Sequence, residues 1–171
     1  MRKIKLFLIT GLLFLSFSTS LFGEEQLTFY GIKFGSTTDD VKTIMTQKEW
    51  NIDKDEVNES GRGQHLVFKK EKGEFAGRTV DFMEFHFGDN ALFQATAFFG
   101  FSASGTPVSQ IAKSYSEKYG FKKDENDSSS FEKYIDSKGN NFLISSYLFR
   151  VYSIEVYNKI SGRDKKIEDD I

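Results

Sequence analysis

Two histidines, His65 and His86, are the only imidazole side chains in the 171-residue chain. Neutral imidazole binds zinc and other transition metals, and it can also serve as a general base near neutral pH. The two histidines are 21 positions apart in different expected strands, without the close spacing that places two imidazoles on one helix face. His86 also lies between Phe85 and Phe87, as a strand residue would. The sequence therefore predicts no metal site and no cofactor.

Acidic and amide side chains gather in two stretches that partly match a calcium loop, Asp53 to Asn58 and Asp124 to Ser128. A calcium loop needs a glycine at its sixth position and a bidentate acid at its twelfth. Neither stretch has the glycine at its sixth position or the acid at its twelfth. We therefore expect two solvated acidic turns.

Nucleophilic catalysis has no recognisable motif in this chain. There is no cysteine, no Gly-x-Ser-x-Gly elbow, and Ser128 to Ser130 reads as a loop. Gly61-Arg62-Gly63 is too short for a phosphate cradle and predicts a turn. The sequence predicts no catalytic residue. A hydrolase of envelope polymers that uses an acid pair hidden among the 25 acidic residues remains the alternative.

The charge balance argues against a nucleic-acid partner. The chain has 23 basic and 25 acidic residues, and three of the basic residues lie in positions 2 to 5. Without residues 1 to 23, the remaining 20 basic and 25 acidic residues give a net charge of −5. No basic stripe offsets this balance, and binding to a phosphate backbone depends on such a patch.

Residues 1 to 23 have the composition of a secretory signal peptide. A basic start is followed by an uncharged stretch from Leu6 to Phe17, and small or weakly polar residues then lead to Gly23. An uncleaved membrane anchor is the alternative, because the 18 uncharged residues from Leu6 to Gly23 approach the length that spans a bilayer. The Ser and Thr residues of the second half favour cleavage. We expect an exported protein, periplasmic or secreted and soluble after cleavage.

The absence of cysteine also excludes disulfides and a lipid anchor at the cleavage point. Residues 24 to 160 are long enough for one domain with its own core. The charged residues 161 to 171 lack apolar periodicity, and we expect a disordered tail.

Two helices are expected in the domain. Ser36 or Thr37, with an acid three residues later, predicts a capped helix that ends near Lys48 to Trp50. Thr106 as a cap and Pro107 as the first helical residue predict a second helix, which Gly120 ends.

Alternation of apolar and polar residues predicts six strands separated by turns. We place them at about 64–69, 79–87, 91–99, 130–136, 141–147 and 151–157. The last turn, Leu148 to Arg150, lacks the usual turn residues.

The order of elements suggests an internal repeat, with pseudo-repeats at about 34–101 and 104–158. The expected fold is α+β and two-layered. Two tandem units, each a helix followed by three antiparallel strands, would form one sheet with both helices on one face.

The segment Gly31-Ile32-Lys33-Phe34-Gly35, which precedes the first helix, and the Lys118-Tyr119-Gly120 ending of the second carry a resemblance. Both resemble motifs of small exported bacterial modules of the β-lactamase-inhibitor-protein type and of the lipoprotein subunit of the outer-membrane β-barrel assembly machine. The chain lacks the cysteines of both groups. The resemblance implies a non-enzymatic binding or assembly role, and it assigns no functional residue.

Aromatic residues make up 16% of the chain, and a run of them leaves one expected strand at Phe98, Phe99 and Phe101. Aromatic side chains are common anchors of protein interfaces. We expect one of two roles for these three residues. Either they contact a partner, or they close the sheet over the ends of the helices. The leading hypothesis is a non-catalytic module that binds another envelope protein. An apolar-ligand-binding domain, marked by an enclosed cavity between sheet and helices, is a further alternative.

Overall fold

The computed structural model describes residues 25–126 and 130–162. Within them the protein is α+β, with three helices and one large antiparallel sheet. The helices are α1 (Thr38–Gln47), α2 (Val108–Tyr119) and α3 (Ile154–Ser161). The sheet strands are β3 (Asn51–Val57), β4 (Gly63–Lys69), β7 (Phe82–Gly88), β8 (Ala91–Phe98), β9 (Lys122–Lys123), β10 (Glu132–Ile135), β11 (Asn141–Ile144) and β12 (Leu148–Tyr152). Two short hairpins, β1 (Thr28–Phe29) with β2 (Ile32–Lys33) and β5 (Glu74–Phe75) with β6 (Arg78–Thr79), complete the fold.

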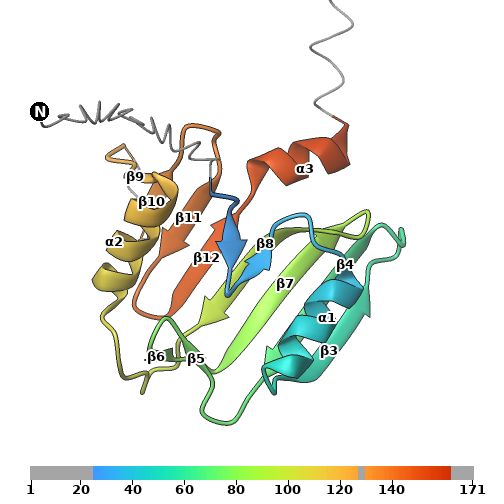
Figure 1. The fold of residues 1–171 in the computed structure, drawn as a ribbon, viewed down its shortest axis with the longest axis horizontal. Helices are drawn as coiled ribbons and strands as arrows, with labels where there is room; N and C mark the ends of the chain where they lie inside the picture. Colours follow the sequence, from blue (N-terminus) through green and yellow to red (C-terminus); the bar gives the residue numbers. More distant parts are fainter. Residues whose placement is uncertain (1–24, 127–129, 163–171) are drawn as a thin grey trace, which may run out of the picture.

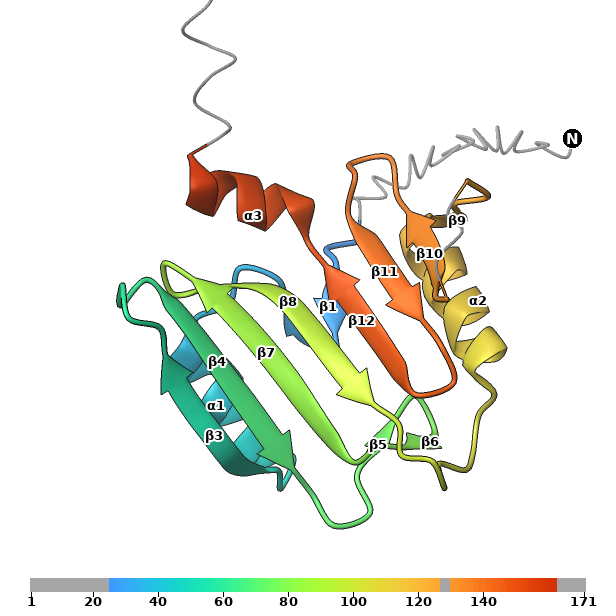
Figure 2. The same cartoon turned by 180° about the vertical axis from the view of Figure 1, so that it is seen from behind.

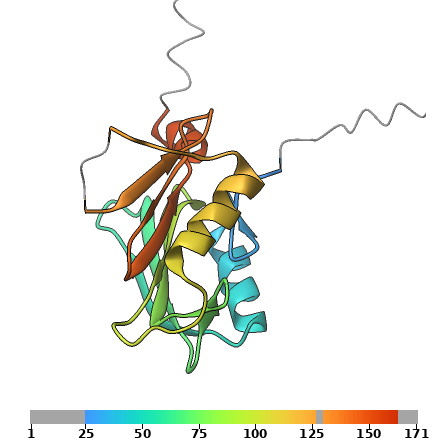
Figure 3. The same cartoon turned by 90° about the vertical axis from the view of Figure 1, so that its left-hand side faces the viewer.

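The eight strands of the sheet are arranged in the order β3-β4-β7-β8-β12-β11-β10-β9. Helices α1 and α2 lie on the same face of this sheet, together with the β1-β2 hairpin (Figure 1). Figure 2 shows the opposite face, which none of the described helices crosses; α3 lies at one end of it. In the side view, α1 and α2 again stand on one side of the strands (Figure 3).

The core lies between the sheet and the helices on the covered face. Its strand residues alternate along β7, where Met83, Phe85 and Phe87 are buried while their neighbours are half-exposed. Helix α1 contributes Val41 and Met45 to this core. They belong to the same hydrophobic cluster as the three buried residues of β7. The core is rich in ring contacts because so many of the buried side chains are aromatic.

Local signals explain both long helices. The Thr37 side chain accepts from the Asp40 backbone N–H and the Asp40 carboxylate accepts from the Thr37 backbone N–H, which completes the expected capping box of α1. Helix α2 ends at Gly120, which adopts a left-handed conformation (φ 75°). At the other end Pro107 is the N-cap and Thr106 makes no capping bond, so that helix begins one residue later than expected.

Three expectations about the strands are wrong. The acidic stretch near Asp53 is the edge strand β3 and not a turn, because its backbone pairs with β4; the Asp53 and Asp55 carboxylates form ion pairs with Lys69 and Lys42. Leu148 to Arg150 belongs to strand β12 and is not a turn. The strand expected at 151–157 ends at Tyr152, because the Ser153 side chain accepts from the Val156 N–H and caps α3.

The segment expected to be a signal peptide, residues 1 to 23, lies outside the described residues, and so does most of the expected tail, residues 163 to 171. Ser161, the first residue of the expected tail, is the last residue of α3. Among the described residues, no helix is long and apolar enough to cross a membrane.

Candidate functional site

The face of the sheet opposite α1 and α2 carries a group of polar residues at its centre, which are half-exposed except for the fully buried Thr96. Strand register places Glu84, Thr96 and Arg150 side by side on β7, β8 and β12. Two residues further along β7, His86 lies directly opposite His65 of the neighbouring strand β4. These residues alternate with the buried core residues of the same strands, so all five point away from the covered face.

The two histidines are in direct contact. Their rings are stacked, with centroids 4.4 Å apart and an interplanar angle of 9°. Their separation of 21 positions does not reveal this contact, because it matches no spacing that places two side chains on one face of a helix. The signal that would have paired them is the register of two neighbouring antiparallel strands, in which residues 65 and 86 are directly opposite.

Glu84 lies beside the stacked rings and approaches both imidazoles through their Nε2 atoms. One carboxylate oxygen is 3.8 Å from His65 Nε2 and the other is 3.8 Å from His86 Nε2. These are ion-pair separations and are too long for hydrogen bonds. The His86 side chain is the main cause of a lowered pKa of the Glu84 carboxyl; burial opposes it, while electrostatic attraction to His65, His86 and Arg150 contributes further. Glu84 is therefore an anion at neutral pH.

Neighbouring polar groups hold this cluster in place. On one side, Glu56 Oε2 of the edge strand is 3.8 Å from His65 Nδ1. On the other side, Arg150 Nε donates to Thr96 Oγ1 at 3.0 Å, which fixes the guanidinium in the row of Glu84. His65 Nε2 is buried and has no hydrogen-bond partner among the described residues.

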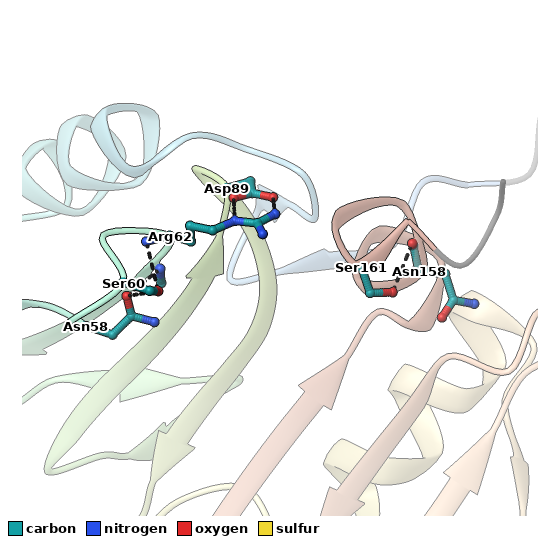
Figure 4. Close-up of polar contacts among 7 residues, drawn as sticks. Asn58, Ser60, Arg62, Asp89, Asn158 and Ser161 are labelled. Atoms are coloured by element: carbon teal, nitrogen blue, oxygen red, sulfur yellow. Dashed lines mark hydrogen bonds and ion pairs between the residues drawn. The ribbon is translucent and has the colours of Figure 1, made fainter.

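A recess of about 640 Å³ opens beside the histidines, where α3 approaches the ends of the strands. We call it the α3 recess; its lining includes Asn58, His65, His86, Phe93, Tyr157 and Ile160. Among its lining residues, Figure 4 shows Asn58, Arg62 and Asp89 on one side and Ser161 of α3 on the other. Its size is within the range of ligand pockets.

The rim of the α3 recess is negatively charged. Arg62 donates two hydrogen bonds to the Asp89 carboxylate, from Nε at 2.8 Å and from a terminal nitrogen at 2.6 Å. The Asp89 carboxylate therefore neutralises the charge of the guanidinium. This pairing lowers the pKa of Asp89. The third charged residue of the lining, Glu56, has a side chain that is 62% exposed. Two carboxylates and one guanidinium thus face the recess.

The aromatic run named as a possible partner contact is divided by the fold. Phe99 is 3% exposed and packs on the covered face beside Arg78, so it is not available to a partner. Phe98 is half-buried on the uncovered face and stacks on Phe82, with centroids 4.4 Å apart. Phe101 is fully exposed in the following loop. The run therefore does not form one patch.

A hidden catalytic acid pair would include a carboxyl with a raised pKa. Instead, hydrogen bonds and ion pairs lower the pKa values of Asp40, Asp55, Glu84 and Asp89. None of these four carboxyls is suited to act as a general acid near neutral pH.

No protein-family model matches this chain, and no curated protein matches it either.

Proposed function

We propose that this protein is an exported, non-catalytic binding module of the cell envelope, and that a segment of a partner protein enters the α3 recess. The observation that carries the proposal is the recess itself, on the face of the sheet that α1 and α2 leave uncovered. The composition of residues 1 to 23 supports export.

The lining indicates the chemistry of the partner segment. Phe93 and Tyr157 lie with ring centroids 5.7 Å apart and, with Ile160, offer an apolar wall. Asn58 and the histidines offer groups that can hydrogen-bond a peptide backbone. Because Glu56 and Asp89 outnumber Arg62 at the rim, a segment with an apolar side chain next to a lysine or arginine complements the recess.

The test is position-specific photocrosslinking in cells that produce the protein. A photoreactive phenylalanine at Ser161, an exposed α3 residue in the recess lining, should give one discrete protein adduct. The matched control is the same group at Glu155, which is also exposed on α3 but lines a different hollow. The adduct should disappear when Asn58→Trp blocks the opposite wall.

Equal adducts from positions 161 and 155, or an adduct that survives Asn58→Trp in a folded protein, would contradict the proposal. Mass spectrometry of the adduct then identifies the partner. It also locates the inserted segment, whose predicted basic and apolar composition is a second check.

The proposal includes an internal duplication and a two-layer arrangement. In support, α1 is followed by four strands of the large sheet and α2 by four others, and the last strands of the two sets, β8 and β12, pair with each other. A duplicated unit would thereby place Thr96 and Arg150 at the middle of the uncovered face.

A further inference from the structure

We propose that His65, Glu84 and His86 form a binding site for a divalent transition-metal ion of the zinc type on the uncovered face of the sheet. This proposal does not depend on partner binding, since it rests on the three side chains and not on the recess volume. It assigns a role to residues for which spacing along the chain predicts no metal site.

The strand register brings the three donor groups together. His65 and His86 are directly opposed, and Glu84 precedes His86 by two residues on the same face of β7. One ligand atom from each of the three residues lies within 4.8 Å of the others. Donor atoms around a tetrahedral zinc with bonds of about 2.1 Å are roughly 3.4 Å apart. An imidazole lone pair lies in the plane of its ring, so the two stacked rings must tilt toward each other by side-chain rotation for both to bind one ion.

The unpartnered nitrogen of His65 points to a missing ligand. Its Nε2 is buried without a hydrogen bond among the described residues, yet it is 3.8 Å from the Glu84 carboxylate. A buried donor or acceptor left unsatisfied is costly, and an ion between Nε2 and the carboxylate would remove that cost.

Glu56 would orient His65 for this role. Metal-binding histidines commonly donate their second N–H to a carboxylate, which fixes the tautomer. Glu56 Oε2 is 3.8 Å from Nδ1, the nitrogen that faces away from the proposed ion. With a proton on Nδ1, the lone pair of Nε2 is free to bind the metal.

The donor set selects the class of ion. Two imidazoles and one carboxylate suit zinc and neighbouring transition metals, whereas calcium and magnesium prefer six or more oxygen ligands. Three protein ligands leave at least one position for water or another ligand. His65 and His86 also line the α3 recess.

The experiment is titration of the purified, untagged protein with Zn²⁺ by calorimetry, with Ca²⁺ as the contrasting ion. We expect one zinc per chain and no calcium binding at the same concentrations. His65→Asn and Glu84→Gln should each weaken zinc binding at least tenfold, and Glu56→Gln should weaken it less, as an outer-shell residue does. Glu155→Gln, which removes an exposed carboxylate on α3, should leave the affinity unchanged.

A second readout separates coordination from misfolding. In the wild-type protein, zinc should shift the nitrogen resonance of His65 Nε2 and leave that of Nδ1 close to its protonated position. Circular dichroism of each variant checks that it is folded. No uptake of zinc by the wild-type protein, or equal affinity in His65→Asn, Glu84→Gln and the wild type, would overturn the proposal while leaving the crosslinking test of the recess unaffected.

Discussion

The imidazole rings of His65 and His86 lie face to face, 4.4 Å apart, although 20 residues separate them in the chain. This contact is a direct consequence of the β4–β7 register, which also brings Glu84 to the same place. A sheet that is covered on one face leaves such pairs accessible on the other. The strand pairing that builds the sheet therefore also assembles the candidate site.

Nuclear magnetic resonance can detect the stacking directly. Each ring shields the protons of the other, so His86→Ala should move the ring-proton resonances of His65 downfield. Phe101→Ala changes a fully exposed aromatic residue and should leave those resonances in place. Unchanged His65 resonances in a folded His86→Ala protein would show that the two strands are not in this register.

Tyr115 ties α2 to the N-terminal hairpin. Its hydroxyl donates to the Thr28 carbonyl at 2.6 Å, and burial raises the pKa of Tyr115 well above its usual value. Tyr115→Phe leaves that carbonyl without its donor, and we expect the free energy of unfolding to fall by about 1–3 kcal/mol. Tyr147→Phe, at an exposed tyrosine, should change it by less than about 0.5 kcal/mol in the same urea titration.

Gly105 is required where the chain before α2 passes the β5-β6 hairpin. Its φ is +104°, and a Cβ there would collide with the Gly77 carbonyl oxygen. We expect Gly105→Ala to cost about 3 kcal/mol or more, from backbone strain and displacement of the hairpin.

Gly120→Ala is the matched control for Gly105→Ala. Gly120 also has a positive φ, but no atom lies within 4 Å of the added Cβ. The expected cost is about 1–2 kcal/mol from the left-handed backbone alone. Thermal unfolding of both variants should rank them in this order, and the reverse order would be inconsistent with the described packing.

Tyr134 should make the protein sensitive to alkali. Burial, with a further contribution from the hydrogen bond to Glu132, raises the pKa of Tyr134 to about 12 from its usual 10.0. Because the folded-state pKa is the higher one, this residue's contribution to stability is complete below pH 10 and is lost as the pH rises to about 12.

Chemical denaturation at several pH values between 10 and 12 tests this dependence. The free energy of unfolding of Tyr134→Phe should fall less steeply over that range than that of the wild type. Tyr147→Phe serves again as the exposed control. Parallel curves for Tyr134→Phe and the wild type would contradict the assignment.

Much of the fold could be predicted from local signals. The capping box at Thr37, the helix end at Gly120 and the alternation of the strand expected at 79–87 each have a cause within a few residues, and each appears in the structure. The α+β class and the large antiparallel sheet follow from the order of such elements. The edge strand β3 was missed because its residues are all exposed and mostly charged, so they show no alternation.

The end of the chain and the candidate site depended on longer-range information. Ile154 and Val156 continue the alternation of β12, but the Ser153 cap and packing against β8 turn this segment into α3. The approach of His65 to His86 depends on how β4 and β7 pair across the intervening β5-β6 hairpin. Neither the periodicity nor the spacing of residues along the chain specifies which residues of β4 and β7 are opposite each other. The histidine cluster could therefore not be predicted from these local patterns.

The affinity of the crosslinked partner for two α3 variants tests the binding role most directly. Once the partner is identified and purified, Ser161→Trp, which fills the α3 recess, should weaken its binding at least tenfold. Glu155→Trp adds the same ring to an exposed position on the same helix but outside the recess, and it should bind within twofold of the wild type. Equal dissociation constants for Ser161→Trp and the wild type would contradict the proposal that this recess receives the partner.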